Sequence, residues 1–498
     1  MKLAVLMEGL EYTVLQGTAD EDVKALVYFS DEAVPGSMFF AVPGTEDYGL
    51  DYAQEAVRRG AGVIAAEPSQ EAWQNRQLAG FLPPDVTLIL VSDVRKAMAH
   101  ASCIFYGNPC RDLLTVGITG TKGKTSTAFM MRAILEEAGI PTGLIGTVKN
   151  GWEGHFEEAD RTTPQSPDIH RWCRKMAEGG CRAVVMEISS QGLKQSRIDG
   201  VLCDAAIFTN LTPDHIGPGE HENFEEYAWW KSRLFSRCQK AVLNRDDPEW
   251  QKMLPEGNLQ EAVTFGTDPG ADYICENLQI KRIEGRPGVE FTMEGHRISM
   301  KLPGAFNAIN GAAAAAAARE LGISWEIIVS ALEKVKIPGR AEPVDTVRHT
   351  SVLVDYAHNG VSLRQILTNL RQYEPSRLIV VFGCGGNRDR NRRFEMGRAA
   401  AELADLTVVT SDNPRKEKPE DIIADITGAM EAAGAGRDSY VIIADRREAI
   451  RRAVAEGKKD DIVLIAGKGH ETYQIAGDKK IHFDDREIVK EAGLIMGE

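Results

Sequence analysis

The sequence of 498 residues has no long hydrophobic run and no excess of positive charge. The N-terminal apolar run, Leu3 to Met7, is too short for a secretory signal, and no run approaches the roughly 18 apolar residues that span a bilayer. The net charge of −15 argues against general binding to nucleic acid or anionic membranes. We expect a cytoplasmic monomer with small-molecule substrates, no nucleic-acid partner and no membrane partner. An anionic substrate would need a local basic site.

The sequence also lacks closely spaced pairs of cysteines. The eight cysteines are scattered, and no two of them form a C-x-x-C pair. This spacing is not typical of a disulfide framework or of a structural zinc site. We therefore expect reduced thiols.

The composition is that of an ordinary globular protein, with 43% hydrophobic and 26% charged residues. The length suggests about three domains. Residues 1–110 read as a small mixed α/β domain, with a strand at SMFFAV (37–42) and a helix near residues 52–60. No low-complexity linker and no convincing internal repeat is found.

Strands and helices alternate after Leu113, which predicts parallel-sheet α/β architecture. The stretch KIPGR, Lys336 to Arg340, marks a second boundary. Beyond it, five apolar strands separated by helices predict a doubly wound domain. The predicted fold class is thus α/β, with three domains at 1–110, 111–339 and 340–498.

A glycine-rich loop follows the strand LLTVGIT, in the stretch TVGITGTKGKTST, residues 115–127. A standard P-loop has a glycine six residues before its lysine, where this chain has Ile118. The strand–loop–helix context nevertheless fits a phosphate site. Glycines let N–H groups approach phosphate, and a helix N-terminus favours negative charge. Lys124 would add a point charge and Thr125 a hydroxyl for Mg²⁺. The alternative is a glycine-rich turn with a capping threonine.

Three polar residues in the same domain fit a metal and phosphate site only when taken with this loop. Glu187 ends the strand AVVME, His215 lies in NLTPDHIGPGEHENF, and Lys231 lies in YAWWKSRLF. Each alone would be read as a solvated surface group. Together with Lys124 they form a plausible catalytic set.

The C-terminal domain carries polar loops at successive strand ends, where ligands collect in such sheets. These loops are DYAHN, FGCGGNRDRNRR, SDNPRKEKP and GKGHE. An arginine fork binds a carboxylate, and Glu471 could pair with an ammonium group. The loops therefore suit a zwitterion such as an amino acid, although a lone arginine-rich loop would be read as a solvated surface.

The ordered set GITGTKGKT, MEISSQGL, NLTPDH, YAWWK, PGR, DYAHN, FGCGGNRDR, DNPR and GKGHE resembles the motifs of the Mur ligases over the whole chain. That family uses a T-G-T-x-G-K-T loop, so the displaced glycine is expected. The resemblance implies a UDP-sugar domain, a central ATPase domain and a Rossmann-like amino-acid domain. It also implies an ATP-dependent amide ligase of peptidoglycan synthesis, which works through an acyl phosphate with two Mg²⁺ ions.

The resemblance assigns roles residue by residue. Catalysis would use Lys124, Glu187, His215 and Lys231, with the metal held by Thr125, Glu187, His215 and Lys231; the family carbamylates the lysine at 231 with CO₂. The nucleotide would contact Gly120, Thr121, Lys122, Gly123, Lys124, Thr125, Ser126, Asn310, Arg340, Asp355 and His358. The UDP-sugar peptide would contact Ser30, Thr162, Thr163, Ser189, Gln195 and Arg197. The amino acid would contact Arg390, Asp412, Asn413, Arg415, Gly467 and Glu471.

The DNPR loop goes with meso-diaminopimelate in this family, whereas lysine-adding members carry a different motif. The implied reaction adds meso-diaminopimelate to UDP-N-acetylmuramoyl-L-Ala-D-Glu. Several positions depart from the family, including Asp31, Leu50, Gln191 and Gly217. The alternatives are a Mur paralogue or a folylpolyglutamate-synthetase-like ligase with another acceptor or amino acid, such as L-lysine, and a non-catalytic nucleotide-binding protein.

Overall fold

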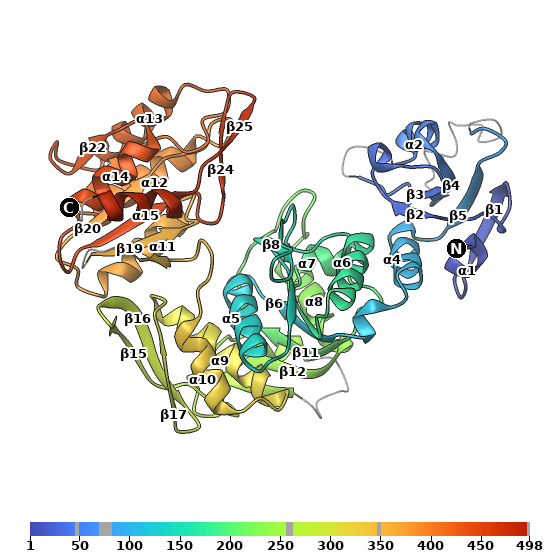
Figure 1. Ribbon diagram of the computed structural model, residues 1–498, viewed down its shortest axis with the longest axis horizontal. Helices are drawn as coiled ribbons and strands as arrows, with labels where there is room; N and C mark the ends of the chain where they lie inside the picture. The colour runs from blue at the N-terminus through green and yellow to red at the C-terminus, as the bar shows by residue number, and fades with distance from the viewer. Residues whose placement is uncertain (45–48, 69–81, 255–261, 346–349, 496–498) are drawn as a thin grey trace. The chain divides into compact units, whose positions relative to one another are not determined.

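The computed structural model describes residues 1–44, 49–68, 82–254, 262–345 and 350–495. The chain divides into two compact units, Met1–Thr264 with Ala316–Gly322, and Phe265–Ala315 with Ile323–Glu498. The first unit holds an N-terminal sheet and a central sheet, and the second holds a small antiparallel sheet and a C-terminal sheet (Figure 1). These sheets confirm the predicted α/β fold class with N-terminal, central and C-terminal parts.

The N-terminal sheet has the strand order β1-β5-β4-β3-β2, in which β1 is antiparallel to β5 and the other pairs are parallel. Its helix α4 is capped by Asp93, whose carboxylate accepts from the backbone N–H groups of Arg95 and Lys96. The elements are β1 (Tyr12–Gln16), β2 (Ala25–Val27), β3 (Ser37–Phe40), β4 (Ala61–Ala66), β5 (Thr87–Val91), α1 (Leu3–Leu6), α2 (Ala53–Arg59) and α4 (Val94–Phe105).

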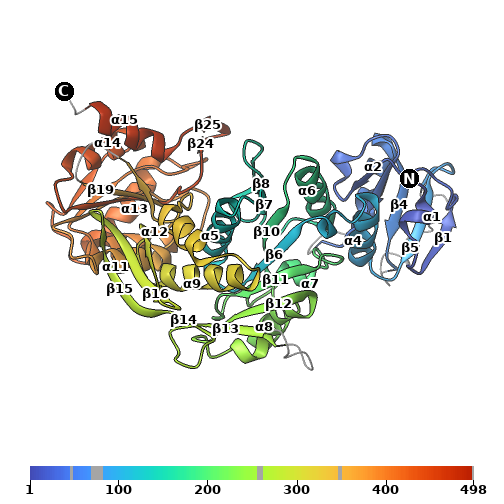
Figure 2. The same ribbon diagram turned by 60° about the horizontal axis from the view of Figure 1, so that its bottom comes forward.

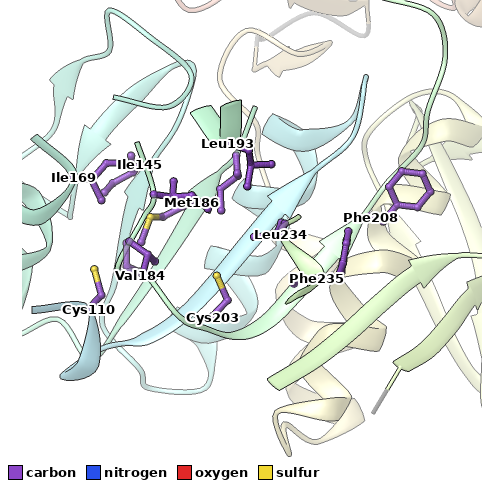
Figure 3. Close-up of a cluster of buried hydrophobic side chains, with 14 of the residues drawn as sticks. Cys110, Ile145, Ile169, Val184, Met186, Leu193, Cys203, Phe208, Leu234 and Phe235 are labelled. Carbon is purple, nitrogen blue, oxygen red and sulfur yellow. The ribbon is translucent and has the colours of Figure 1, made fainter. Parts of the chain in front are cut away.

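The strands of the central sheet that lie wholly in the first unit follow the order β12-β11-β6-β10-β7-β8-β9, parallel from β12 to β7 and antiparallel at β8 and β9. Its parallel strands are apolar runs because both faces are covered. Figure 3 shows part of the buried cluster on one face, to which Val184, Met186 and Phe208 contribute. The strands are β6 (Leu114–Thr119), β7 (Thr142–Ile145), β8 (Lys149–Gly151), β9 (Glu157–Glu158), β10 (Ala183–Glu187), β11 (Cys203–Phe208) and β12 (Cys238–Asn244).

Four helices accompany the central sheet: α5 (Lys124–Glu137), α6 (Ser166–Glu178), α7 (Ser190–Lys194) and α8 (Phe224–Ser232). Helix α5 packs on β6, β7 and β10. We call the predicted phosphate-binding loop, residues 120–125, the phosphate loop. Its glycines, Gly120 and Gly123, come directly before α5, so the carboxyl end of β6 and the N-terminus of α5 face the same space.

The second unit contains a three-stranded antiparallel sheet in the order β15-β16-β17, labelled in Figure 1; β15 and β16 lie side by side in Figure 2 as well. Helix α9 is an alanine-rich helix whose residues 305–315 belong to this unit. The elements in this stretch are β13 (Ala262–Gly266), β14 (Tyr273–Ile274), β15 (Glu276–Ile283), β16 (Arg286–Met293), β17 (His296–Met300), α9 (Ala305–Glu320) and α10 (Trp325–Lys334).

The C-terminal sheet has the order β18-β19-β23-β20-β21-β22 and is parallel except at β18. One buried cluster joins it to α11, α12 and α13, and another joins it to α14 and α15, so helices cover both faces. The elements are β18 (Glu342–Val344), β19 (Ser351–Asp355), β20 (Leu378–Phe382), β21 (Leu406–Val409), β22 (Tyr440–Ile442), β23 (Ile462–Ala466), β24 (Tyr473–Ala476), β25 (Lys479–His482), α11 (Gly360–Arg371), α12 (Asn391–Leu403), α13 (Pro419–Ala432), α14 (Arg446–Glu456) and α15 (Asp485–Ile495).

Among the described residues, no helix has the length and apolar character needed to cross a bilayer. All eight cysteines carry free thiols.

Candidate active site

The phosphate loop connects β6 to α5 with two glycines in left-handed or extended positive-φ conformations. Gly123 has φ 87°, and Gly120 has φ 150°. A Cβ at Gly120 would lie 2.0 Å from the hydroxyl of Thr209, so no other residue fits there without a shift. The ammonium of Lys124 folds over the loop and donates to the carbonyl groups of Gly120, at 2.8 Å, and Thr121, at 3.0 Å. The loop thus has the backbone shape and the cation that a phosphate site needs.

The segment that follows β11 holds the phosphate loop in place through hydrogen bonds. Asn210 accepts from the N–H of Lys122 at 2.9 Å and donates to its carbonyl group at 2.9 Å. The hydroxyl of Thr121 lies 3.0 Å from that of Tyr227 on α8. The loop is therefore fixed by its neighbours and needs no glycine at position 118, which is a buried β6 strand residue.

A buried carboxylate lies directly beside the first turn of α5. Glu187, at the end of β10, is 1% exposed. It accepts from the hydroxyl of Thr125 at 2.8 Å, and from the hydroxyl and N–H of Thr147, both at 2.9 Å. The structure thus joins Glu187 to the phosphate-loop threonine, in an arrangement of oxygen donors that suits a hard divalent cation.

Lys231 lies under the same loop. Its amine is buried, donates to the carbonyl group of Gly120 at 2.8 Å, and lies 4.6 Å from the ring centroid of Tyr227. Burial lowers the pKa of Lys231 well below its ordinary value, and the charge of Lys124 lowers it further. Such an amine holds a proton weakly, and the neutral form is the nucleophilic one.

His215 is the more exposed member of the predicted set. Its Nδ1 lies 2.9 Å from a carboxylate oxygen of Glu220, and its ring centroid is 6.4 Å from that of Tyr227. Its backbone has φ 55°, in the left-handed region. The ring is thus linked to the phosphate loop through Tyr227, which itself contacts Thr121.

The side chains around Glu187 offer oxygen ligands for a metal ion, the class of site predicted from the sequence, but the described residues form no closed cage there. Among the described residues, no three histidine, cysteine, aspartate or glutamate side chains gather as a metal site. Mg²⁺ does not need such a cage, because it keeps several waters and takes one or two protein oxygens plus substrate phosphates. Thr125 and Glu187 supply oxygens of this kind, so the residues present fit Mg²⁺.

The residues expected to hold the UDP-sugar peptide lie largely together. The hydroxyl of Thr163 is 2.9 Å from the carbonyl oxygen of Glu187 and 3.1 Å from the hydroxyl of Ser189. Arg197 donates to the carbonyl group of Thr163 at 2.8 Å and to the amide oxygen of Gln195 at 2.6 Å.

Two further predicted residues complete this set. The hydroxyl of Thr162 lies 3.1 Å from that of Thr147, which contacts Glu187 in turn. Ser30 lies in the N-terminal part and donates to Glu55 at 2.9 Å. Five of the six predicted acceptor residues therefore form a connected group beside the buried carboxylate.

Three of the predicted nucleotide residues in the second unit surround Tyr356. Asp355, at the end of β19, accepts from the N–H groups of Ala341, at 2.7 Å, and Ala357, at 2.8 Å. Burial raises its pKa, and the nearby Arg340 opposes that rise. The guanidinium carbon of Arg340 is 5.5 Å from the Tyr356 ring centroid, and the ring of His358 is 4.6 Å from it.

Asn310, the fourth of these residues, is a buried α9 side chain. Its amide lies 3.5 Å from the amide oxygen of Asn307.

The DNPR and GKGHE loops meet through a network of charged and amide groups. Asn413 donates to Glu471 at 3.0 Å, and the buried Lys468 donates to both, at 3.1 Å and 3.2 Å. Arg415 has φ 53° and donates to the carbonyl group of Gly386 at 2.8 Å. Holding an arginine backbone in the left-handed region costs free energy, which the contacts of the surrounding loop must offset. Such strained residues are often found at binding sites.

Asp412 lies at the base of the same network. One of its carboxylate oxygens is buried without a hydrogen-bond partner. A Cβ on Gly467 would approach that oxygen to 2.7 Å, so glycine keeps the space open. The guanidinium of Arg446 is 4.0 Å from the same oxygen, and its main partner is the buried Asp485, at 2.7 Å.

Arg390, which was predicted to contact the amino acid, is paired with a carboxylate of the protein in this structure. Its guanidinium fork binds Asp425, at distances from 2.7 to 3.1 Å, and the same carboxylate accepts from Arg393 at 2.9 Å. The side chain of Arg390 is 67% exposed. Its contact with an amino acid remains a prediction.

Sequence reasoning missed several residues that shape these groups. They are Thr147, Asn210, Tyr227, Tyr356, Arg446 and Asp485. Asn210 lies in the NLTPDH motif, so the sequence does contain a signal that could have found it. Nothing in the sequence marks Thr147 or the Arg446–Asp485 pair.

Comparison with known proteins identifies the family. Residues 118–318 match the model of the Mur ligase middle domain, and residues 339–469 match that of the Mur ligase glutamate ligase domain. A UDP-N-acetylmuramoyl-L-alanyl-D-glutamate–2,6-diaminopimelate ligase of Caldanaerobacter subterraneus subsp. tengcongensis is 40% identical over 491 residues, covering 99% of this chain and 98% of the relative. The chain belongs to the Mur ligase family. The resemblance stated from the motifs is thereby confirmed.

Solved structures agree with this assignment. A UDP-N-acetylmuramoyl-L-alanyl-D-glutamate–2,6-diaminopimelate ligase aligns with a TM-score of 0.70 and 27% identity, covering 100% of this chain and 99% of that one. A folylpolyglutamate synthase of Mycobacterium tuberculosis aligns with a TM-score of 0.56 and 18% identity over 74% of this chain, which shows a shared fold alone. This Mur ligase is an ATP-dependent ligase, and Mur ligases use ATP and Mg²⁺.

Proposed function

We propose that this Mur ligase joins meso-diaminopimelate to UDP-N-acetylmuramoyl-L-Ala-D-Glu in peptidoglycan synthesis. The observation that carries the choice of amino acid is the network formed by Asn413, Lys468 and Glu471 beside Arg415. The curated relative that is 40% identical is named for this reaction. The residues expected to bind the acceptor lie beside Glu187, which supports the same reaction.

The amino-acid network suits a head group that carries both charges. Diaminopimelate differs from lysine by a second carboxylate at its distal end, next to an ammonium group. Arg415 would pair with that carboxylate and Glu471 with the ammonium, while Lys468 holds Glu471 in place at 3.2 Å. Lysine would leave the guanidinium of Arg415 without its anion, which is a penalty against the wrong substrate.

The chemistry activates an unreactive acid. An oxygen of the acceptor carboxylate attacks the γ-phosphorus of ATP, the bond to ADP breaks, and an acyl phosphate forms. The amine of diaminopimelate then attacks the acyl carbon, phosphate leaves, and the amine loses a proton as the amide forms. Lys124 and the N–H groups of residues 120–126 would hold the phosphates, with charge stabilisation as the main contribution.

Two Mg²⁺ ions would neutralise charge as it moves between oxygens. Thr125 would hold one ion, and Glu187 and His215 would hold the other. Lys231 would carry a carbamate formed from its amine and CO₂. The lowered pKa of Lys231 supports this, because only a neutral amine attacks CO₂. The resulting anion, in the place of a cation, would orient metal.

The remaining assignments are proposals of the same kind. Asn310, Arg340, Asp355 and His358 would contact the nucleotide, and Ser30 would join Thr162, Thr163, Ser189, Gln195 and Arg197 in contacting the acceptor. We propose domain boundaries at 1–110, 111–339 and 340–498, and a cytoplasmic monomer.

The test is a coupled assay of phosphate release over a panel of acceptors and amino acids. Release should require ATP, UDP-N-acetylmuramoyl-L-Ala-D-Glu and meso-diaminopimelate together. Release with L-lysine but not with diaminopimelate would refute the choice of amino acid. Release only with another acceptor would indicate a Mur paralogue with a different substrate.

A further inference from the structure

A loop of the first unit carries His215, and His221 closes that loop. We call residues 215–221, which lie between β11 and α8, the histidine loop. The N–H of His221 donates to the carbonyl group of His215 at 3.1 Å, and the N–H of Gly217 donates to the carbonyl group of His221 at 3.0 Å. His215 has φ 55°, a left-handed conformation that costs free energy in residues other than glycine. The pairing with His221 helps to hold His215 in this conformation.

The histidine loop also orients the ring of His215. Its Nδ1 lies 2.9 Å from a carboxylate oxygen of Glu220. In metal-binding histidines, one ring nitrogen usually bonds to a carboxylate, a carbonyl group or water while the other binds the metal. Nε2 would therefore be the atom that His215 offers to a metal ion. The position of that atom depends on the geometry of the histidine loop.

The side chain of His221 connects the histidine loop to helix α7. Its ring is fully buried, and Nε2 lies 2.8 Å from the hydroxyl of Ser190, which is also buried. Ser190 is the first residue of α7, directly after Ser189, whose hydroxyl accepts from the N–H of Gly192 at 3.0 Å. Ser189 is a predicted contact of the acceptor. One buried hydrogen bond thus joins the loop of a predicted metal ligand to the helix of a predicted acceptor contact.

A second contact joins the same two segments, but it is open to solvent. Lys194, the last residue of α7, donates to the carbonyl group of Glu220 at 3.0 Å and pairs with Glu226 at 2.8 Å. Solvent-accessible contacts of this kind contribute little to stability, whereas a buried polar group that loses its partner is costly. The bond from His221 to Ser190 is therefore the stronger connection between the histidine loop and α7.

The ring of His221 makes this connection without a charge. Burial lowers the pKa of His221 below its ordinary value of 6.5, and Glu226 opposes that shift. The ring is thus neutral at pH 7. Its Nδ1 is buried with no hydrogen-bond partner among the described residues, and it lies 3.8 Å from a carboxylate oxygen of Glu226. A neutral side chain that reaches Ser190 should therefore be able to replace the histidine.

We propose that His221 is a positioning residue that fixes His215 relative to α7. The inference rests on the proposed function, because it takes His215 as a ligand of Mg²⁺ and Ser189 as a contact of the acceptor. The acceptor carboxylate must meet the γ-phosphate beside the metal, so a small displacement between these two segments lowers the rate. His221 acts through His215 and Ser190 and is not itself a catalytic residue.

Substitutions at these positions separate the hydrogen bond from packing. His221→Phe keeps an aromatic ring and removes Nε2. His221→Gln places an amide near the position of Nε2, and an amide can either donate to or accept from the hydroxyl of Ser190. Ser190→Ala removes the partner. The matched control is His170→Phe, because His170 is a second fully buried histidine of the first unit, and neither of its ring nitrogens has a hydrogen-bond partner among the described residues.

Metal binding is measured without turnover, with Mn²⁺ as the probe, in bicarbonate with the acceptor and no nucleotide. The EPR signal of free Mn²⁺ falls as the ion binds. His221→Phe and Ser190→Ala should each weaken Mn²⁺ binding about tenfold, the scale of losing a group that orients a metal ligand. His221→Gln should recover most of the loss, and His170→Phe should bind as the wild type does. The double variant of His221→Phe and Ser190→Ala should bind no more weakly than either single variant, because both act through one bond.

The affinity for the acceptor alone, measured by calorimetry, should be the same in His221→Phe as in the wild type. A loss of acceptor affinity as large as the loss of Mn²⁺ affinity would show that the substitution distorts α7, and would overturn the inference. Wild-type Mn²⁺ binding by His221→Phe, an equal loss in His221→Gln, or additive losses in the double variant would overturn it as well.

The proposed function is tested apart from this inference by phosphate release. A wild type that releases phosphate with the acceptor and diaminopimelate keeps the proposed function, whatever the variants of His221 show. A wild type that binds no Mn²⁺ and releases no phosphate would refute both.

Discussion

Replacing Lys231 by methionine tests two separate proposals about this buried amine: that it carries a carbamate, and that burial lowers its pKa. Methionine has about the same volume and no charge, so Lys231→Met keeps the packing against Tyr227 while it removes the amine. We expect turnover to fall by at least about 100-fold, the scale of losing one group that stabilises the charge in a transition state. Stability should not fall, because the substitution removes an amine whose burial beside Lys124 disfavours its charged form and so costs free energy in the folded state.

The lowered pKa of Lys231 also predicts that stability should depend on pH, and by how much. Burial holds the pKa of Lys231 in the folded protein below its ordinary value of 10.5. Between those two pKa values the folded amine is neutral and the unfolded amine is charged, so unfolding takes up a proton. The free energy of unfolding then rises with pH by up to about 1.4 kcal/mol per pH unit, up to 10.5. Lys231→Met should lack this contribution.

The assay combines phosphate release with denaturant unfolding at several pH values. Lys175→Met is the control, because Lys175 is an exposed lysine on α6 of the same unit. A second variant, Lys231→Ala, leaves space for a small acid, and acetate or formate should restore part of its turnover.

Full turnover by Lys231→Met would refute the carbamate role. Identical pH slopes for the wild type and Lys231→Met would refute the lowered pKa. Either result can occur without the other, so the two arguments are tested separately.

Three further substitutions test other parts of the site. Arg415→Lys should weaken use of diaminopimelate by about 1–3 kcal/mol in kcat/KM and leave the KM of the acceptor unchanged; equal kinetics would place the residue outside the site. Thr125→Ala should lower kcat/KM for MgATP about 10- to 100-fold by removing the hydroxyl that contacts Glu187, and Thr125→Ser should retain most activity; equal loss in both variants would indicate a packing role. Gly120→Ala should cost about 2–4 kcal/mol of stability in denaturant unfolding, since its Cβ would meet a threonine hydroxyl at 2.0 Å. Gly154→Ala has open space around its Cβ but a left-handed φ of 78°, so it should cost only the backbone strain of about 1–2 kcal/mol; a larger loss there than at Gly120 would contradict the steric argument.

The sequence predicted the sheets and the position of the phosphate loop well because both depend on local patterns. Apolar runs followed by glycine, and then by helix-forming residues, define a strand, a loop and a helix over about 20 residues. The loop from Gly120 to Thr125 is placed by that pattern alone. The displaced glycine misleads a strict motif search, because position 118 belongs to the strand and Asn210 provides the bracing.

Contacts between distant segments could not be predicted in the same way. The amine of Lys231 meets the carbonyl group of Gly120 across 111 positions, and Thr147 meets Glu187 across 40. Nothing local distinguishes Lys231 from a solvated helix lysine. The ion pair between Arg390 and Asp425 is a further example, since it depends on how α12 and α13 pack against each other.

The ion pair between Arg446 and Asp485 joins the last helix, α15, to the start of the DNPR loop. Both side chains are fully buried, and the same guanidinium approaches Asp412. A chain shortened to end before α15 would lose Asp485 and leave Arg446 drawn toward Asp412, at the start of the DNPR loop. Removal of α15 would also take Ile488, Val489 and Ala492 out of the buried core, so it should destabilise the C-terminal sheet as well as disturb the start of the DNPR loop.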